Sequence, residues 1–149
     1  MTATIRTSQS DRALGAVLTA AIVALALTTG WIHFNLGGLL FTLNGLGYAG
    51  LAALYVIAAV APHPLIASFS WAPRVALAGY ALVTIVAWAI QGPYFSTAYV
   101  AKAVEVALIA LITLDTFRVY GGPIGLVRAA FASVTSIFGG GGQAGPAAA

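Results

Sequence analysis

The chain has 149 residues, of which 61% are hydrophobic and only 6% are charged, and its mean hydropathy is +1.01. About a quarter of the residues of a soluble domain are charged, so this composition excludes an ordinary soluble protein and favours a membrane-embedded one. The formal net charge of +3 comes from basic residues scattered singly along the chain, which excludes a nucleic-acid-binding patch. The absence of cysteine excludes disulfides and thiolate chemistry.

Four apolar stretches are candidates to cross a bilayer, which takes about 20 residues. They run from about Ala13 to Ile32, Leu39 to Ala61, Val75 to Ile90 and Thr97 to Val119. The first follows a polar leader, residues 1–12, and the others are separated by Gly- and Pro-containing segments typical of loops. The sequence therefore predicts an all-α fold in which residues 13–120 form a four-helix transmembrane bundle.

Five arginines should lie on one side of this bundle: Arg6, Arg12, Arg74, Arg118 and Arg128. We place Arg74 in the loop before the third helix. The positive-inside rule makes their side cytoplasmic, so both termini should be cytoplasmic. The alternative for the first helix is a signal peptide cleaved near Ala24–Ala26, which would leave three crossings and remove the charge bias.

Residues 123–138, after the fourth helix, carry apolar side chains at largely helical spacing. These are Leu126, Val127, Ala130, Phe131, Val134 and Phe138. The segment is too short to span a bilayer, so we expect an amphipathic helix on the inner membrane surface. The Gly- and Ala-rich tail, residues 139–149, has nothing to bury and is expected to be disordered.

Each predicted crossing carries polar or aromatic side chains on one face. The sets are Thr19, Thr29 and His33; Asn44, Tyr48 and Tyr55; Tyr80, Thr84, Trp88 and Gln91; and Lys102, Glu105 and Thr116. Lipid disfavours polar groups, so these faces should meet inside the bundle. Two rows of small residues, Gly45–Ala49–Ala53 and Ala16–Ala20–Ala24, predict close helix packing.

Lys102 and Glu105 are the most informative polar pair, because charge at membrane depth is costly and marks a functional or assembly site. Being three residues apart, they share a helix face and can pair. His33, Asn44 and Gln91 should lie at a similar depth and supply the hydrogen bonds that a buried ion pair needs. Two interpretations stay open. The cluster is either an internal brace, which we favour, or a polar pocket at the outer end for a small ligand, a quinone head group or a proton.

Asp115 and Arg118 form a second pair, also three residues apart, at the cytoplasmic end of the fourth helix. We interpret them as an interfacial ion pair with Arg74 on the same side. The preceding loop segment, Ser68–Arg74, contains Phe69 and Trp71 and should act as an interfacial anchor.

Catalytic and cofactor signals are weak. His33 and His63 should lie at opposite ends of the bundle, about 30 Å apart, which excludes a shared haem. The carboxylates Asp11, Glu105 and Asp115 are too few and too dispersed for a metal site, and no Ser-His-Asp set shares a depth. We therefore expect neither an enzyme nor a bound metal or cofactor.

Three motifs carry a family resemblance: His33–Gly37 (HFNLG), Leu43–Tyr48 (LNGLGY) and Ala101–Leu108 (AKAVEVAL). With them the chain resembles small four-helix integral membrane proteins of prokaryotes that are grouped as a family of unknown function. The resemblance covers roughly Ala13–Tyr120 and implies four crossings of the inner membrane of a prokaryotic cell. It directs attention to His33, Asn44, Lys102 and Glu105 and implies no activity. The chain is also similar to four-helix subunits of quinone-linked oxidoreductases, in size and helix count alone.

The sequence thus predicts a non-catalytic membrane protein that packs against larger partners. We expect an accessory or structural subunit of a membrane complex, such as one of respiratory or photosynthetic electron transfer. The alternative is a protein that handles a small molecule, a quinone or protons through the polar cluster at the outer end.

Overall fold

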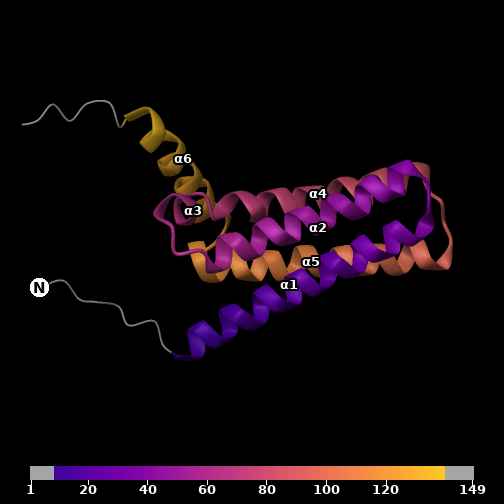
Figure 1. Cartoon of the computed structure of the whole chain (residues 1–149), viewed down its shortest axis with the longest axis horizontal. Coiled ribbons are helices and arrows are strands. Elements are labelled where there is room, and N and C mark those ends of the chain that lie inside the picture. The colour runs from indigo at the N-terminus through magenta and orange to yellow at the C-terminus, as the bar shows by residue number, and fades with distance from the viewer. Residues whose placement is uncertain (1–8, 140–149) are drawn as a thin grey trace, which may run out of the picture.

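A computed structural model describes residues 9–139, and every regular element in that range is a helix. The helices are α1 (Gln9–Leu36), α2 (Leu39–Val60), α3 (Pro64–Ser68), α4 (Trp71–Gln91), α5 (Ser96–Tyr120) and α6 (Pro123–Gly139). Four of them are long and apolar enough to cross a membrane: α1, α2, α4 and α5 (Figure 1). The predicted all-α four-helix bundle with a short C-terminal helix is confirmed.

The four long helices form a ring in which each has two neighbours. Helix α1 packs against α2 and α5, and α4 packs against the same two helices. The buried core between them consists of Ile22, Ala26, Tyr48, Ala52, Tyr55, Leu77, Ala81, Leu108 and Ile112. Many large apolar side chains remain exposed on the outside of the ring, as expected where lipid rather than water is the solvent. The chain is therefore a multi-pass membrane protein.

Helices α1 and α2 approach each other closely near their connecting turn. Gly37 and Gly38 make that turn with φ of 74° and 83°, a region that other residues rarely adopt. Just beyond the turn, a Cβ on Gly45 would lie 2.7 Å from the carbonyl oxygen of Gly30. Only glycine at position 45 permits this approach, so the predicted row Gly45–Ala49–Ala53 packs closely at Gly45, whereas Ala53 is exposed. The other row is wrong as a packing surface, because Ala16, Ala20 and Ala24 are all exposed.

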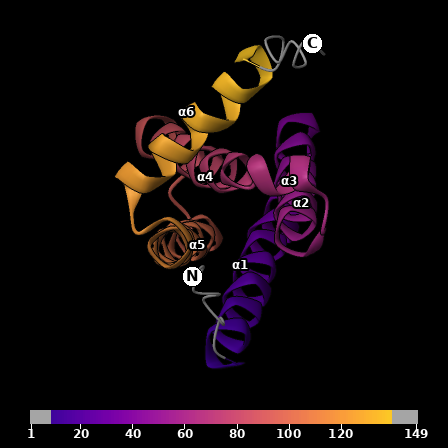
Figure 2. The ribbon, with the colours of Figure 1, turned by 90° about the vertical axis from the view of Figure 1, so that its left-hand side faces the viewer.

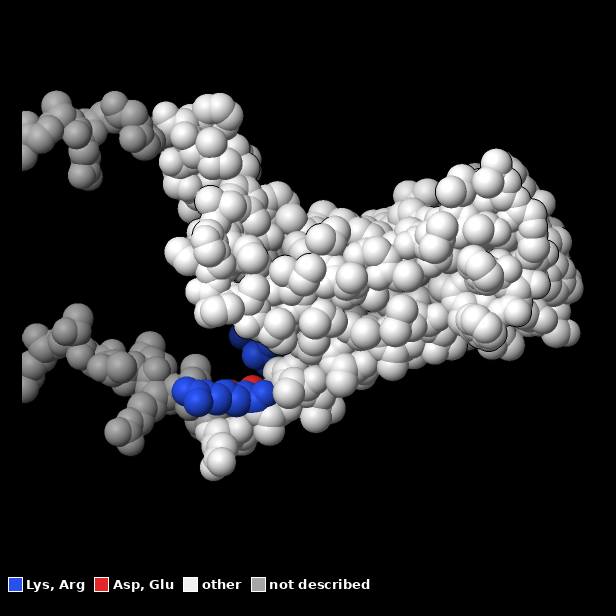
Figure 3. All heavy atoms as spheres, viewed as in Figure 1, with Lys and Arg blue, Asp and Glu red and all other residues white. Residues whose placement is uncertain are grey.

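The two ends of the bundle differ in charge. At the arginine end, defined by Arg12, Arg74, Arg118 and Arg128, helices α1 and α4 begin and α2 and α5 end. At the lysine end, defined by His33 and Lys102, the chain turns from α1 to α2 and from α4 to α5. Figure 3 shows basic atoms gathered at the arginine end, whereas the visible face of the lysine end has none. This arrangement places the described arginines on one side, as the orientation argument required.

Several predicted boundaries need correction. Helix α1 begins at Gln9, so residues 9–12 of the predicted leader are helical. Helix α4 begins at Trp71, which puts Arg74 in its first turn and not in a loop. Pro73 does not prevent the helix from beginning at Trp71, because the missing N–H of a proline in a first turn has no partner there anyway. The short helix α3 was not predicted.

Helix α6 lies across the arginine end and leads away from the bundle (Figure 2). It confirms the helix expected over residues 123–138. Ser133 donates a hydrogen bond to the carbonyl of Ser68 and so fixes α6 to the end of α3. The predicted disorder of the tail falls on residues 140–149, outside the described part of the chain, as do residues 1–8 of the leader.

Candidate functional site

Glu105 lies at the centre of a buried network near the lysine end. Its carboxylate is 0% exposed and accepts hydrogen bonds from three side chains on three helices. Lys102 Nζ donates to Oε2 at 2.6 Å, Thr84 Oγ1 donates to the same oxygen at 2.9 Å, and Thr29 Oγ1 donates to Oε1 at 3.0 Å. The predicted Lys102–Glu105 pair is present. A lysine near a helix end often extends its ammonium group to the membrane interface. Lys102 instead turns toward Glu105 and is only 8% exposed.

His33 completes one side of this network. Its Nδ1 is 2.8 Å from the carbonyl oxygen of Thr29, which only accepts, so the proton must lie on Nδ1. Nε2 then faces Glu105 Oε1 at 3.7 Å, which is beyond hydrogen-bonding distance. His33 is therefore a neighbour of the carboxylate, held in orientation by its own helix.

Tyr48 extends the network to α2. The single proton of the Thr84 hydroxyl is within reach of Glu105 and of the Ala81 carbonyl, so the Tyr48 hydroxyl, 2.9 Å away, donates to Thr84. The ring of Tyr48 packs edge-on against Tyr80, with centroids 4.9 Å apart. We call Thr29, His33, Tyr48, Thr84, Lys102 and Glu105 the Glu105 network. It joins all four membrane-spanning helices.

Two of the five residues predicted for this cluster do not join it. Gln91 is exposed at the end of α4, and its side chain makes no hydrogen bond to the described residues. Asn44 contributes only its backbone carbonyl, which accepts from Tyr80 at 3.3 Å, and its buried Oδ1 has no partner among the described residues. Thr29, Thr84 and Tyr48 occupy the places expected for them. All three belong to the polar stripes identified in the sequence, but their bonds to Glu105 were not predicted.

A second network surrounds Asp115 near the arginine end. The carboxylate is 0% exposed and binds two arginines: Arg74 through Nη2 at 2.7 Å and Arg118 through Nη2 at 2.7 Å. The Tyr55 hydroxyl donates to Oδ2 at 2.6 Å. Asp115 therefore lies inside the bundle, and the prediction of an interfacial Asp115–Arg118 pair missed two of its partners.

Arg74 is buried and is in contact with residues of several helices. It is 6% exposed, and Nη1 donates to the carbonyl of Ser70 at 2.6 Å. The guanidinium carbon lies 5.2 Å from the ring centroid of Tyr55 and 5.6 Å from that of Tyr120. Aromatic faces attract such a cation most when both are desolvated. Arg74 is thus an internal strut and not part of an interfacial anchor.

An apolar layer separates the two networks. Glu105 and Asp115 are ten residues apart on α5, about 15 Å at the helical rise. Leu108 and Ile112 lie between them on the same face, and Leu77 and Ile22 close the layer from α4 and α1. The polar groups of one network therefore do not reach those of the other.

The next question is whether the possible metal and haem ligands of residues 9–139 lie close enough together to share a site. Residues 9–139 contain no group of three or more histidine, cysteine, aspartate or glutamate side chains that could hold a metal ion. His33 lies near the end of α1 at the lysine end, and His63 caps α3 at the arginine end. They are separated by the 22 residues of α2, about 33 Å, so they cannot share a haem.

Comparison with protein-family models, with curated proteins and with solved structures finds no match. The four-helix architecture implied by the resemblance is present, and no family is identified.

Proposed function

We propose that this protein is a non-catalytic accessory subunit of a larger membrane complex. The two networks support this proposal because their donors and acceptors come from the chain itself. Each joins several helices, and the apolar layer between them interrupts any polar path along the bundle. Buried polar groups used in this way fix helix register and rotation. Such a bundle keeps a defined shape and can offer a fixed surface to a partner subunit. The assembly we propose is an electron-transfer complex of respiration or photosynthesis.

The single observation that carries the proposal is the uncovered stripe on α6. Ile124, Val127, Phe131, Val134 and Phe138 follow one another at alternating steps of three and four residues, and all are exposed. Phe131 is 68% and Phe138 82% exposed. The opposite side of α6 holds Ser133, which is bonded to Ser68. Steps of three and four residues place the stripe on one face of α6, so the face that was expected to lie on the membrane surface can also pack against a helix of a partner subunit.

The test compares two lysine substitutions on α6. Phe131→Lys places a charge in the middle of the stripe, whereas Ser136→Lys places the same charge on the opposite, exposed side of the helix. Tagged full-length protein, produced at its natural level, is extracted with mild detergent and resolved by native electrophoresis. We expect the unsubstituted and Ser136→Lys proteins to migrate in a large complex and Phe131→Lys to migrate alone. If all three migrate alone, the subunit proposal fails.

A second candidate, proton handling at Glu105, rests on the hydrogen-bonded chain from Tyr48 through Thr84 to the carboxylate. The geometry favours it less, because the three cavities described are lined by other residues. Full-length protein reconstituted into vesicles containing a pH-sensitive dye distinguishes the two. A proton flux that Glu105→Gln abolishes would support this candidate, and no flux above that of protein-free vesicles would reject it.

A further inference from the structure

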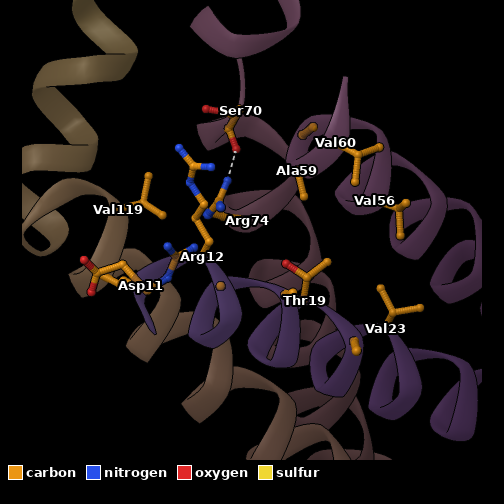
Figure 4. A pocket seen from close by; sticks show the side chains of 15 residues that line it. Asp11, Arg12, Thr19, Val23, Val56, Ala59, Val60, Ser70, Arg74 and Val119 are labelled. Carbon is orange, nitrogen blue, oxygen red and sulfur yellow. Dashed lines mark hydrogen bonds between the residues drawn. The ribbon is translucent and has the colours of Figure 1, made fainter. Parts of the chain in front are cut away.

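A cavity of about 670 Å³ opens at the arginine end, between the first half of α1 and the ends of α2, α4 and α5 (Figure 4). Its volume is within the range of small-molecule sites, roughly 300–1,000 Å³. Arg12 enters it from α1 and Arg74 from α4. In the space-filling view, blue and red atoms of basic and acidic residues lie in the recess at this end, below α3 and α6 (Figure 3).

The mouth of this cavity carries an excess of positive charge. Arg12, Arg74 and Arg118 contribute three guanidinium groups, and Asp11 and the underlying Asp115 contribute two carboxylates. One positive charge is left over. Arg118 binds Asp115 through Nε and Nη2. Its Nη1 lies close to Gly15 on α1, because a Cβ added to Gly15 would be 3.0 Å from this nitrogen.

Deeper in the cavity the walls become apolar. On α1 the lining residues change from Asp11 and Arg12 to Ala16, Ala20 and Val23, and the opposite wall is formed by the last turns of α2. From Asp11 to Val23 the helix rises about 18 Å. A bilayer headgroup layer is roughly 5–8 Å thick, and hydrocarbon lies below it. From the arginine end inward, the lining of the cavity changes from charged to apolar. One bilayer leaflet changes from headgroups to hydrocarbon in the same direction and over a similar distance.

We propose that this cavity binds one anionic phospholipid of the surrounding bilayer. Its phosphate lies beside Arg12 and Arg118, and Arg74, which is already bonded to Asp115 and to the Ser70 carbonyl, contributes only its charge. One acyl chain runs along Ala16, Ala20 and Val23 between α1 and α2. A guanidinium is the favoured partner of a phosphate because its planar set of donors matches the phosphate oxygens. A partner helix fits less well, since it would have to bring its own acidic group to the same depth.

The proposal is tested by native mass spectrometry of the full-length protein in nonionic detergent. Phosphatidylglycerol and phosphatidylcholine with identical acyl chains are added in turn, and inorganic phosphate is the free-anion arm. We expect one phosphatidylglycerol per chain, bound more tightly than phosphatidylcholine and not displaced by inorganic phosphate. Equal affinity for the two lipids, displacement of the lipid by phosphate, or a second protein copy in place of lipid would each overturn the proposal.

Two matched pairs of variants locate the site. Arg12→Gln should raise the dissociation constant for phosphatidylglycerol about fivefold, the effect of one basic side chain near a headgroup layer, whereas Arg128→Gln on α6 should not change it. Ala20→Phe fills the apolar part of the cavity, and Ala24→Phe places the same ring one turn further along α1, outside the lining. We expect only Ala20→Phe to weaken lipid binding. Equal binding by both members of either pair would place the lipid elsewhere.

Discussion

Glu105 and Lys102 provide the most direct test of the brace interpretation through a double-mutant cycle. Glu105→Gln removes the buried negative charge, Lys102→Met removes the positive one, and the double variant removes both. The two side chains are three residues apart and bonded at 2.6 Å, so each single change leaves the other charge without its main partner. If the pair is an internal brace, the double variant should be more stable than either single variant.

The expected magnitudes follow from the burial of the two groups. Lys102→Met leaves a carboxylate with 0% exposure and only hydroxyl donors, which should cost about 3–5 kcal/mol of unfolding free energy. Glu105→Gln should cost less, about 2 kcal/mol, because Lys102 lies near the start of α5 and can move toward the interface. In the double variant the amide oxygen introduced by Glu105→Gln still accepts from Thr29 or Thr84, so the loss should stay below about 2 kcal/mol. The resulting coupling energy is at least about 3 kcal/mol.

The assay is unfolding of the purified proteins in mixed detergent micelles, followed by far-ultraviolet circular dichroism and tryptophan fluorescence. Arg128→Met, an exposed change on α6, is the control for loss of a charge and should leave stability unchanged. Additive single changes, with a coupling energy below about 0.5 kcal/mol, would refute the reasoning. A double variant less stable than both single variants would refute it as well.

Three further predictions concern packing, the second network and topology. Gly45→Ala should destabilise the bundle by about 1–3 kcal/mol because its Cβ has no room against α1, whereas Gly50→Ala, in open space, should be neutral or slightly stabilising in the same unfolding assay. Asp115→Ala should cost about 3–5 kcal/mol, since it leaves a buried guanidinium without its carboxylate, and a loss below about 1 kcal/mol would contradict that network. The chain has no cysteine, so single cysteines report topology cleanly: Tyr94→Cys should react with an impermeant thiol reagent in intact cells, and Ser136→Cys only after permeabilisation.

Much of the bundle was predictable because it depends on features that are local in the sequence. The length and apolarity of the crossings predicted four spans, and the Gly- and Pro-containing segments placed the loops. The spacing of Lys102 and Glu105 predicted their pairing, since residues three apart share a helix face. The polar stripes likewise identified Thr29 and Thr84 as inward-facing.

The errors arose where the answer depends on rotation about a helix axis or on tertiary packing. Asn44 and Gln91 were grouped with Glu105 by depth, but similar depth does not determine which way a side chain points. Arg74 was placed in a loop because the third apolar stretch was taken to begin at Val75, and its burial against Asp115 depends on how α4 packs on α5. The exposure of Ala20 depends on the packing of α1 within the ring, which a row of small residues in the sequence does not determine.

The most direct test of the central claim is the native mass of the protein in its own membrane. Membranes from the source cells are extracted with a mild detergent, and the unsubstituted chain is located by native electrophoresis and by the proteins that purify with it. We predict co-migration with one defined set of larger membrane subunits. A stable monomer or homo-oligomer with no accompanying subunit would contradict the account.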